Sequence, residues 1–170
     1  QQMDAELSEH QLRAYSDIQR HFENKNVVLL HGVTSSGKTE IYTKLIREQI
    51  QNNKQVLYLL PEIALTTQLI VRLRKHFGES VLIYHSRFNE EERVEVWREV
   101  HKAQPCIVIG ARSAVFLPYQ NLGLVIIDEE HDPSFKQMDP APRYNARESA
   151  IWLAKLHGAT VIATVGDDEK

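Results

Sequence analysis

The residues that point most directly to chemistry lie in a glycine-rich segment, 32–39, which reads Gly-Val-Thr-Ser-Ser-Gly-Lys-Thr. Two glycines followed by lysine and a hydroxyl residue, at this spacing, are typical of a phosphate-binding loop. Glycines let backbone N–H groups wrap a phosphate, and the N-terminus of a following helix adds positive potential. An apolar run precedes the segment and a helical pattern follows it, which favours this interpretation over a chance Gly/Ser turn.

Each residue type in the loop has an expected role. Lys38 is expected to reach the β- and γ-phosphates, and the Thr39 hydroxyl is expected to bind Mg²⁺. The residues expected to hold ATP in this segment are Gly32, Thr34, Ser35, Ser36, Gly37, Lys38 and Thr39. The loop therefore predicts a site for a nucleoside triphosphate with Mg²⁺.

A pair of acids, Asp128 and Glu129, directly follows the apolar run 124–127. An acid at the end of a strand can hold Mg²⁺, usually through water, opposite the Thr39 hydroxyl, and Glu129 is placed to polarise the water that attacks the γ-phosphate. Adjacent acids are common in solvated loops, so the pair alone is a weak signal. Together with the phosphate loop it favours ATP hydrolysis over phosphoryl transfer to a small acceptor, with Lys38, Asp128 and Glu129 as the catalytic residues.

Composition limits the class of protein. The chain has 170 residues, 42% of them hydrophobic and 25% charged, which is typical of a globular protein, and we expect one domain over residues 1–170. The formal net charge of −3 argues against a general nucleic-acid-coating protein but not against a motor that grips a phosphate backbone along one track. No apolar stretch reaches membrane-spanning length and the start is no signal peptide, so a soluble protein is expected.

Cys106 is the only cysteine, and it lies in an apolar run. A disulfide or a cysteine-based zinc site within this chain is therefore excluded, and a reducing cytosolic setting is expected. Cys106 itself is expected to behave as a small buried hydrophobe.

Apolar runs alternate with helical patterns along the chain. The predicted strands are 27–30, 56–60, 81–84, 106–109, 124–127 and 160–163, and the predicted helices are 8–22, 39–51, 64–77, 89–103 and 145–157. This alternation predicts an α/β fold with a parallel sheet covered on both faces, which binds ligands at the carboxyl ends of its strands. The stretch 132–144 has three prolines and no period, and is predicted to be a surface excursion.

Two polar clusters have structural explanations. Ser8 followed by Gln11 is a capping box by pattern, so Gln11 has a purely structural interpretation. The acids 90–92 follow Asn89, a favoured helix cap, and stand in the positive first turn of the predicted helix. Helix electrostatics therefore explains this cluster better than a metal site does.

Five segments of the chain carry a family resemblance: Pro61–Thr66, Gly110–Ala114, Asp128–Asp132, Phe135–Gln137 and Pro142–Arg147. Together they resemble the superfamily 2 helicases of the DExH type and, among these, the bacterial replication-restart, or primosomal, helicases. The resemblance runs from Leu7 to about Ile162 and is far more specific than either nucleotide motif alone.

The resemblance implies more than the motifs do. It implies a three-layer, RecA-like P-loop NTPase fold with a mainly parallel sheet, as the first of two motor lobes, and ATP hydrolysis that drives 3′-to-5′ translocation on single-stranded DNA at stalled or repaired forks. It implies as partners single-stranded or forked DNA, other primosome proteins, single-stranded DNA-binding protein and a second RecA-like lobe, with no membrane. It also implies a location in the bacterial cytoplasm, and zinc only in the parent protein outside this chain.

The resemblance assigns further residues, each with a plainer alternative. Gln11 matches the adenine-reading glutamine, unless it serves only the capping box. Thr66, Arg112 and Ser113 would meet DNA phosphates, where Thr66 has helix capping and Arg112 a surface salt bridge as alternatives.

The excursion resembles an aromatic-rich loop that senses single-stranded DNA. Phe135 would stack on a base and Lys136 would pair with phosphate, whereas the plainer alternative places Phe135 against the sheet beneath its own loop. His131 would couple the nucleotide site to the DNA side, or would simply be solvated.

The end of the chain departs from the family pattern. Family members continue with Gly-Ser-Ala-Thr-Pro-Ser, which couples hydrolysis to movement, and here only Ala163-Thr164 echoes it. The acidic segment 165–170 is open to interpretation as native sequence, an altered terminus or a non-native, disordered tail. Because this chain shows no second lobe or arginine finger, the fragment is expected to bind MgATP weakly, to hydrolyse it barely and to unwind nothing.

Two other functions compete with a motor lobe. One is a RecA-like module that senses nucleotide or docks a partner without motor activity. The other is a small-molecule P-loop kinase, which the acid motif at 128–131 and the segment 110–114 disfavour.

Overall fold

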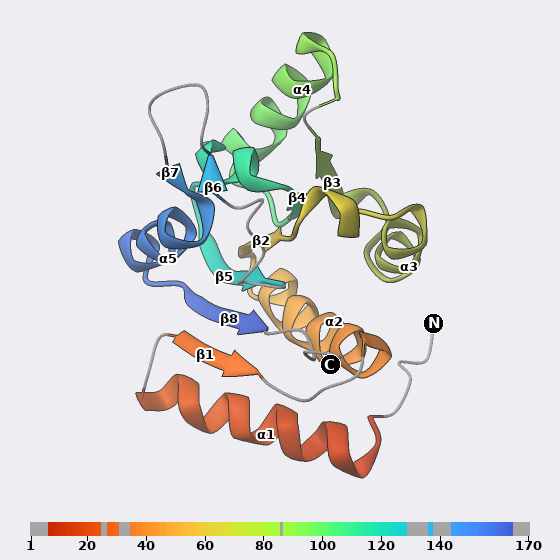
Figure 1. The fold of residues 1–170 in the computed structure, drawn as a ribbon, viewed down its shortest axis with the longest axis vertical. Helices are drawn as coiled ribbons and strands as arrows, with labels where there is room; N and C mark the ends of the chain where they lie inside the picture. Colours follow the sequence, from red (N-terminus) through yellow and green to blue (C-terminus); the bar gives the residue numbers. More distant parts are fainter. Residues whose placement is uncertain are drawn as a thin grey trace.

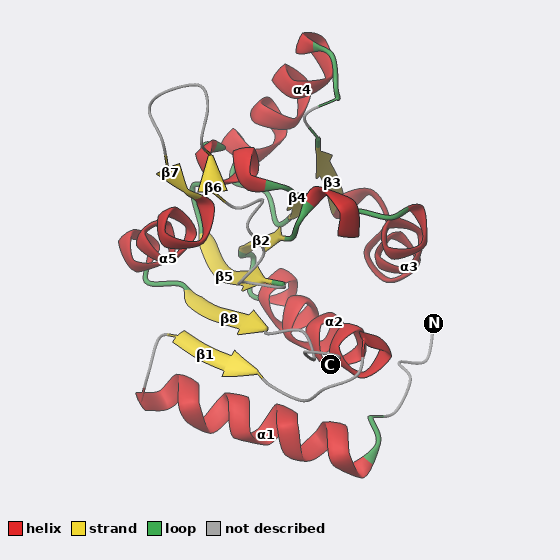
Figure 2. Ribbon diagram, viewed as in Figure 1, coloured by secondary structure: helices red, strands yellow, loops and turns green. Residues whose placement is uncertain are grey.

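A six-stranded, fully parallel sheet forms the centre of the molecule (Figures 1 and 2). This computed structural model describes residues 7–24, 27–30, 35–85, 87–128, 136–137 and 144–164. The strands are β1 (Val27–Leu30), β2 (Gln55–Leu59), β3 (Val81–Tyr84), β4 (Ile107–Gly110), β5 (Leu122–Ile127) and β8 (Thr160–Thr164), in the order β1-β8-β5-β2-β4-β3. Every residue of β2 and β4 is buried, as expected for apolar strands covered on both faces.

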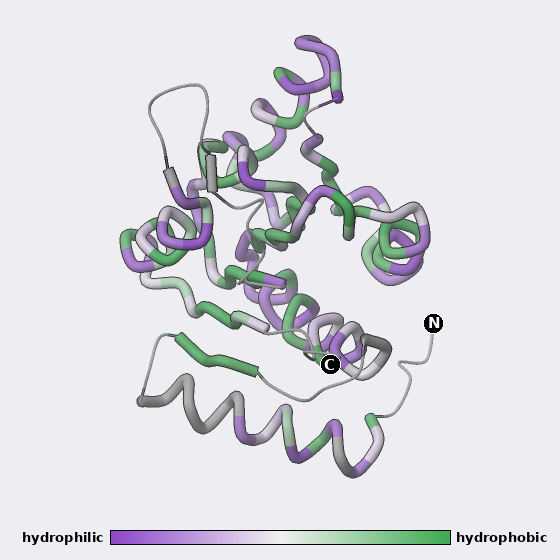
Figure 3. The backbone as a smooth tube through the Cα atoms, in the orientation of Figure 1, coloured by the Kyte–Doolittle hydropathy of each residue, from purple (hydrophilic) through white to green (hydrophobic). Residues whose placement is uncertain are grey.

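Helices cover both faces of the sheet. They are α1 (Glu9–Asn24), α2 (Ser35–Gln51), α3 (Thr67–Phe77), α4 (Glu90–His101) and α5 (Ala146–His157). One core cluster joins α2 and α3 to the sheet, with side chains of α1 packed at its border, and the other joins α4 and α5 to the opposite face. Figure 3 shows the matching pattern, with hydrophobic strands inside and helices of mixed character outside. The predicted three-layer α/β architecture is confirmed.

The helix boundaries follow from local capping chemistry. The Asn89 side chain accepts a hydrogen bond from the Glu92 N–H at 2.9 Å, and Asn145 accepts one from the Arg147 N–H at 2.9 Å. Gly158 ends α5 in the left-handed conformation, with φ 64°. The acids 90–92 stand in the first turn of α4, and no cluster of metal-ligating side chains occurs among the described residues.

Two local predictions were wrong. The helix predicted from residue 64 begins at Thr67, because Glu62–Ala64 form a separate 3₁₀ turn, η1, and the chain becomes helical only after the Thr66 cap. The helix predicted from residue 39 begins at Ser35. Within the predicted excursion, β6 (Lys136–Gln137) and β7 (Tyr144–Asn145) pair as a short antiparallel ribbon that the sequence did not predict. Residues 132–135 and 138–143 lie outside the described part of the chain.

Cys106 is buried, as predicted, and 5% exposed. Burial raises the pKa of its thiol and outweighs the opposing effect of a hydrogen bond with Gln55, which leaves the pKa at about 11, so the thiol stays protonated near neutral pH. Among the described helices, none has the length and apolar character needed to cross a bilayer.

Candidate nucleotide site

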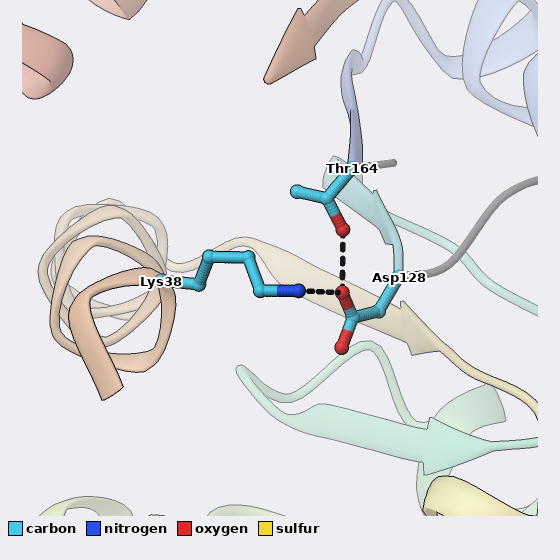
Figure 4. A network of polar contacts seen from close by, with 3 residues as sticks. All are labelled: Lys38, Asp128 and Thr164. Carbon is cyan, nitrogen blue, oxygen red and sulfur yellow. Dashed lines mark hydrogen bonds and ion pairs between the residues drawn. The ribbon is translucent and has the colours of Figure 1, made fainter. Parts of the chain in front are cut away.

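The site is built where α2 meets the carboxyl ends of two central strands. Lys38 lies in the first turns of α2, and its Nζ donates a hydrogen bond to Oδ1 of Asp128 at 3.2 Å (Figure 4). Asp128 directly follows β5, and its backbone N–H donates to the carbonyl of Leu59, at the end of β2, at 2.8 Å. The Lys38 and Asp128 side chains are 12% and 16% exposed, so the ion pair is mostly shielded but still reachable from solvent.

A second donor reaches the same carboxylate oxygen. Thr164, the last residue of β8, donates a short hydrogen bond from its hydroxyl to Oδ1 of Asp128 (Figure 4). The register explains the contact: Ile127 of β5 pairs with Ala163 of β8, so the next residue on each strand is Asp128 on one and Thr164 on the other. Sequence reasoning noticed Ala163-Thr164 only as an echo of a coupling motif and missed Thr164 as a site residue.

Tyr42 lies one turn beyond Lys38 on α2 and is fully buried. Its ring packs edge-on against Tyr58, with 5.6 Å between ring centroids. The buried hydroxyl makes no hydrogen bond within the described structure. Burial raises the pKa of Tyr42 and the negative charge of Asp128 raises it further, whereas a side-chain interaction with the Thr164 hydroxyl, which does not reach the geometry of a full hydrogen bond, lowers it. The four-residue spacing from Lys38 was the only sequence signal that could have placed Tyr42 here.

The described side chains fit a Mg²⁺–nucleotide. A carboxylate and a threonine hydroxyl are the hard oxygen ligands that Mg²⁺ prefers, and the Lys38 ammonium suits phosphate. Thr39, the predicted hydroxyl ligand, is buried beside Lys38 at the start of α2. Lys38 and Asp128 are of opposite charge and neutralise each other in this ion pair.

Much of the predicted phosphate and DNA machinery lies outside the described residues. This holds for Gly32, Thr34, Glu129, His131 and Phe135. Ser35 and Ser36 are described only as the first residues of α2, Gly37 is buried next to them, and Lys136 is described only as the first residue of β6. The roles assigned to all of these residues stay predictions.

Gln11 forms the predicted capping box at the start of α1. Its Oε1 accepts a hydrogen bond from the Ser8 N–H at 2.7 Å, and its own N–H donates to the Ser8 hydroxyl at 3.2 Å. The structural interpretation is therefore confirmed, and the adenine-reading role of Gln11 stays a prediction.

The candidate DNA residues gather at the same edge of the sheet as the nucleotide site. Thr66 follows the η1 turn after β2, and Arg112 and Ser113 open a 3₁₀ turn, η3 (Arg112–Phe116), after β4. β2 and β4 are neighbours, and the Leu60 N–H donates to the Gly110 carbonyl at 3.1 Å, which joins the ends of the two strands. Arg112 and Ser113 are half-buried, and Thr66 is exposed.

Thr66 has a measurable structural role, because its hydroxyl accepts the Leu69 N–H at 3.2 Å and caps α3. Thr66→Ala is expected to lower the free energy of unfolding by about 1 kcal/mol, the usual cost of losing an N-cap. Urea denaturation followed by circular dichroism measures this change. Thr66→Ser keeps the cap, and the neighbouring exposed Thr67 provides Thr67→Ala as a control. A Thr66→Ala chain as stable as the unmodified one would show that the cap contributes nothing.

The fold and the site together define the class of protein. It is a RecA-like P-loop domain in which Lys38, on the helix after the phosphate loop, faces Asp128 at the carboxyl end of β5. A family model described as DEAD/DEAH box helicase matches residues 8–151. The chain belongs to the DEAD/DEAH box helicase family.

Among individual proteins, the chain is similar to replication restart protein PriA of several bacteria. It is 42% identical to the Bacillus subtilis protein over 158 residues, covering 92% of this chain and 20% of the relative. It is 45% identical to the Haemophilus influenzae protein over 156 residues, covering 92% and 21%. The chain thus spans about a fifth of the length of these relatives.

Two solved structures share the fold. A structure of RecG bound to a three-way DNA junction superimposes with a TM-score of 0.69 at 22% identity, covering 96% of this chain and 21% of the RecG chain. A nuclease-deletion mutant of the Type ISP restriction-modification enzyme LlaGI, in complex with a DNA substrate mimic, gives a TM-score of 0.61 at 13% identity, covering 97% and 19%. At these identities the likeness concerns the fold.

Proposed function

We propose that this chain is the ATP-binding motor lobe of a bacterial replication-restart DNA helicase. The observation that supports this most directly is the 3.2 Å contact between Lys38 and Asp128, which joins the phosphate loop to the acid after β5. Family membership and the 42% to 48% identity to PriA proteins support the replication-restart assignment. Residues 1–170 would form one lobe, in which 165–170 would be a non-native or disordered tail.

The described residues suggest how the nucleotide is received. Lys38 would exchange Asp128 for the β- and γ-phosphates, and the Asp128 carboxylate would then help to hold Mg²⁺ together with the Thr39 hydroxyl. Mg²⁺ supplies neutralisation of the phosphate charge when bound. Asp128 stays anchored through its N–H on Leu59 and through the Thr164 hydroxyl. Glu129, the next residue along the chain, would polarise the attacking water.

The finer assignments are part of the same proposal. DNA would cross the sheet edge at Thr66, Arg112 and Ser113, with Phe135 and Lys136 on the excursion, and hydrolysis would drive 3′-to-5′ movement. The similarity to replication restart proteins supports forked or single-stranded DNA as the substrate. Primosome proteins, single-stranded DNA-binding protein and a zinc site elsewhere in the parent complete the proposal, which places the protein in the bacterial cytoplasm.

A second motor lobe is essential to this proposal. In P-loop enzymes an arginine finger contributes about 10³- to 10⁵-fold in rate. We therefore expect the 170-residue chain to bind MgATP weakly and to hydrolyse it barely. Strong DNA-stimulated hydrolysis by this chain alone would contradict the need for a second lobe.

The test is the ATPase activity of the full-length parent with and without single-stranded or forked DNA. The unmodified parent should be stimulated by DNA. Glu129→Gln should retain MgATP binding and lose most hydrolysis, because only the group that activates water has changed. Arg112→Ala should weaken DNA binding and reduce its salt dependence, as expected for a lost phosphate contact. Activity that DNA does not affect, or no activity in the unmodified parent, would overturn the translocase proposal.

A further inference from the structure

The Tyr42 hydroxyl is a buried polar group with no hydrogen bond in the described structure. Burying a hydroxyl without a partner costs free energy, since the group loses water and gains nothing. Phenylalanine would fill the same space without this cost. Native structures contain few such groups, so this one requires an explanation.

The surroundings of Tyr42 suggest an explanation for its buried hydroxyl. Its ring is fixed between α2 and β2, because the residue is fully buried and packs edge-on against Tyr58. The polar groups that act on the hydroxyl are Asp128 and Thr164. Tyr42 and Lys38 stand one turn apart on the same side of α2, so both are directed toward the end of β5.

Thr164 has the capacity to link Tyr42 to the site. Its hydroxyl uses its single hydrogen on Asp128, which leaves the oxygen able to accept a hydrogen bond. A phenol O–H is a suitable donor for that oxygen. The resulting chain would run from Tyr42 through Thr164 to Asp128, and a hydroxyl that accepts one hydrogen bond donates a stronger one.

We propose that Tyr42 is a positioning residue, whose hydroxyl bonds to Thr164 when Lys38 leaves Asp128 for the nucleotide. In the structure Oδ1 of Asp128 accepts from both Lys38 and Thr164. When Lys38 turns to phosphate, only Thr164 still holds this oxygen, and the Tyr42 bond fixes the direction of the Thr164 hydrogen. The Asp128 carboxylate then remains oriented for Mg²⁺. Tyr42 stays protonated throughout, and the inference rests on the proposed MgATP site.

The test compares two buried tyrosines in the 170-residue chain. Tyr42→Phe removes the hydroxyl that lacks a partner. Tyr119→Phe is the matched control, because the Tyr119 hydroxyl is buried but donates to the Ala114 carbonyl at 2.7 Å, on the opposite face of the sheet. Two quantities are measured for each variant: the Tm without ligand, and the Kd of a fluorescent ADP analogue, N-methylanthraniloyl-ADP, with Mg²⁺ and with EDTA.

The two variants should behave in opposite ways. Tyr42→Phe should have an unchanged or higher Tm, a Kd with Mg²⁺ weakened roughly threefold to tenfold, as for one neutral hydrogen bond, and an unchanged Kd in EDTA. Tyr119→Phe should have a lower Tm and an unchanged Kd. The restriction to Mg²⁺ separates positioning of Asp128 from a general effect on nucleotide binding.

The remaining outcomes distinguish failure of the role proposed for Tyr42 from failure of the proposed MgATP site. If the unmodified chain binds the analogue with Mg²⁺ and Tyr42→Phe binds equally well, the positioning role is overturned and the MgATP site stands. A Tm loss in Tyr42→Phe as large as in Tyr119→Phe, or equal weakening with and without Mg²⁺, would also overturn it. If the unmodified chain fails to bind the analogue at all, the proposed site fails and the role of Tyr42 with it.

Discussion

Lys38→Ala should lower the ATPase rate of the full-length parent by about 10²- to 10³-fold, the effect of removing one preorganised donor from a charged transition state. In the 170-residue chain it should make binding of MgATP undetectable. The reason is positional: Lys38 is mostly buried, and its Nζ already reaches the acid of the site, 3.2 Å from Oδ1 of Asp128. Steady-state hydrolysis and equilibrium binding of the fluorescent ADP analogue measure the two effects.

Lys44→Ala on the same helix is the matched control for this prediction. Lys44 is exposed, and its Nζ lies 4.5 Å from the centre of the Tyr15 ring of α1 rather than in an ion pair with Asp128. This variant should bind nucleotide like the unmodified chain. Circular dichroism should show that both variants are folded. Normal nucleotide binding by a folded Lys38→Ala chain would mean that segment 32–39 is not a phosphate site.

Gly110→Ala should clearly destabilise the fold, because there is no room for a methyl group at this position. A Cβ at this position would lie 2.7 Å from the Cβ of Ala114 and 2.8 Å from the carbonyl oxygen of Tyr84. Both atoms are fixed by the backbone, so β4 would have to move away from β3 and η3. We expect a loss of about 1–3 kcal/mol in the free energy of unfolding, read from urea denaturation.

A second variant tests the cause of this loss. Gly110→Ala combined with Ala114→Gly removes the contact with one methyl group but leaves the carbonyl of Tyr84 in place. The double variant should therefore regain the lost free energy of unfolding only if the clash with Ala114 is the main cause of the loss. Comparing the double variant with the two single variants measures this. A stable Gly110→Ala single variant would show that the strand ends can separate without cost, and that Arg112 is less firmly positioned than the structure indicates.

The sequence was sufficient to predict the strands and most helix ends. Strands such as β4 and β5 are buried on both faces, so each is a nearly continuous apolar run that stands out without any alignment. Asn89, Asn145 and Gly158 mark helix ends through interactions with their own neighbours. These features are local, which is why they can be read from a single chain.

The site residues that belong to no sequence motif could not be predicted in this way. Thr164 contacts Asp128 only because β8 lies next to β5, and strand order depends on packing between distant segments. Tyr42 looks like an ordinary core residue of α2, and its importance arises from an absent hydrogen bond. The η1 turn was missed because residues 62–64 carry no apolar period that separates a 3₁₀ turn from a helix.

The position of β1 has a consequence for how the protein is made. β1, which leads into the phosphate loop, stands at the edge of the sheet; among the described strands it pairs with β8 alone, where Val27 lies opposite Val161. A ribosome therefore releases the phosphate-loop strand long before β8, with which it pairs, exists. Such non-local pairing makes folding slow and leaves an open strand edge in the meantime. The nucleotide site would then be among the last parts of the lobe to form during synthesis, and shortened chains that end before β8 should be prone to aggregation.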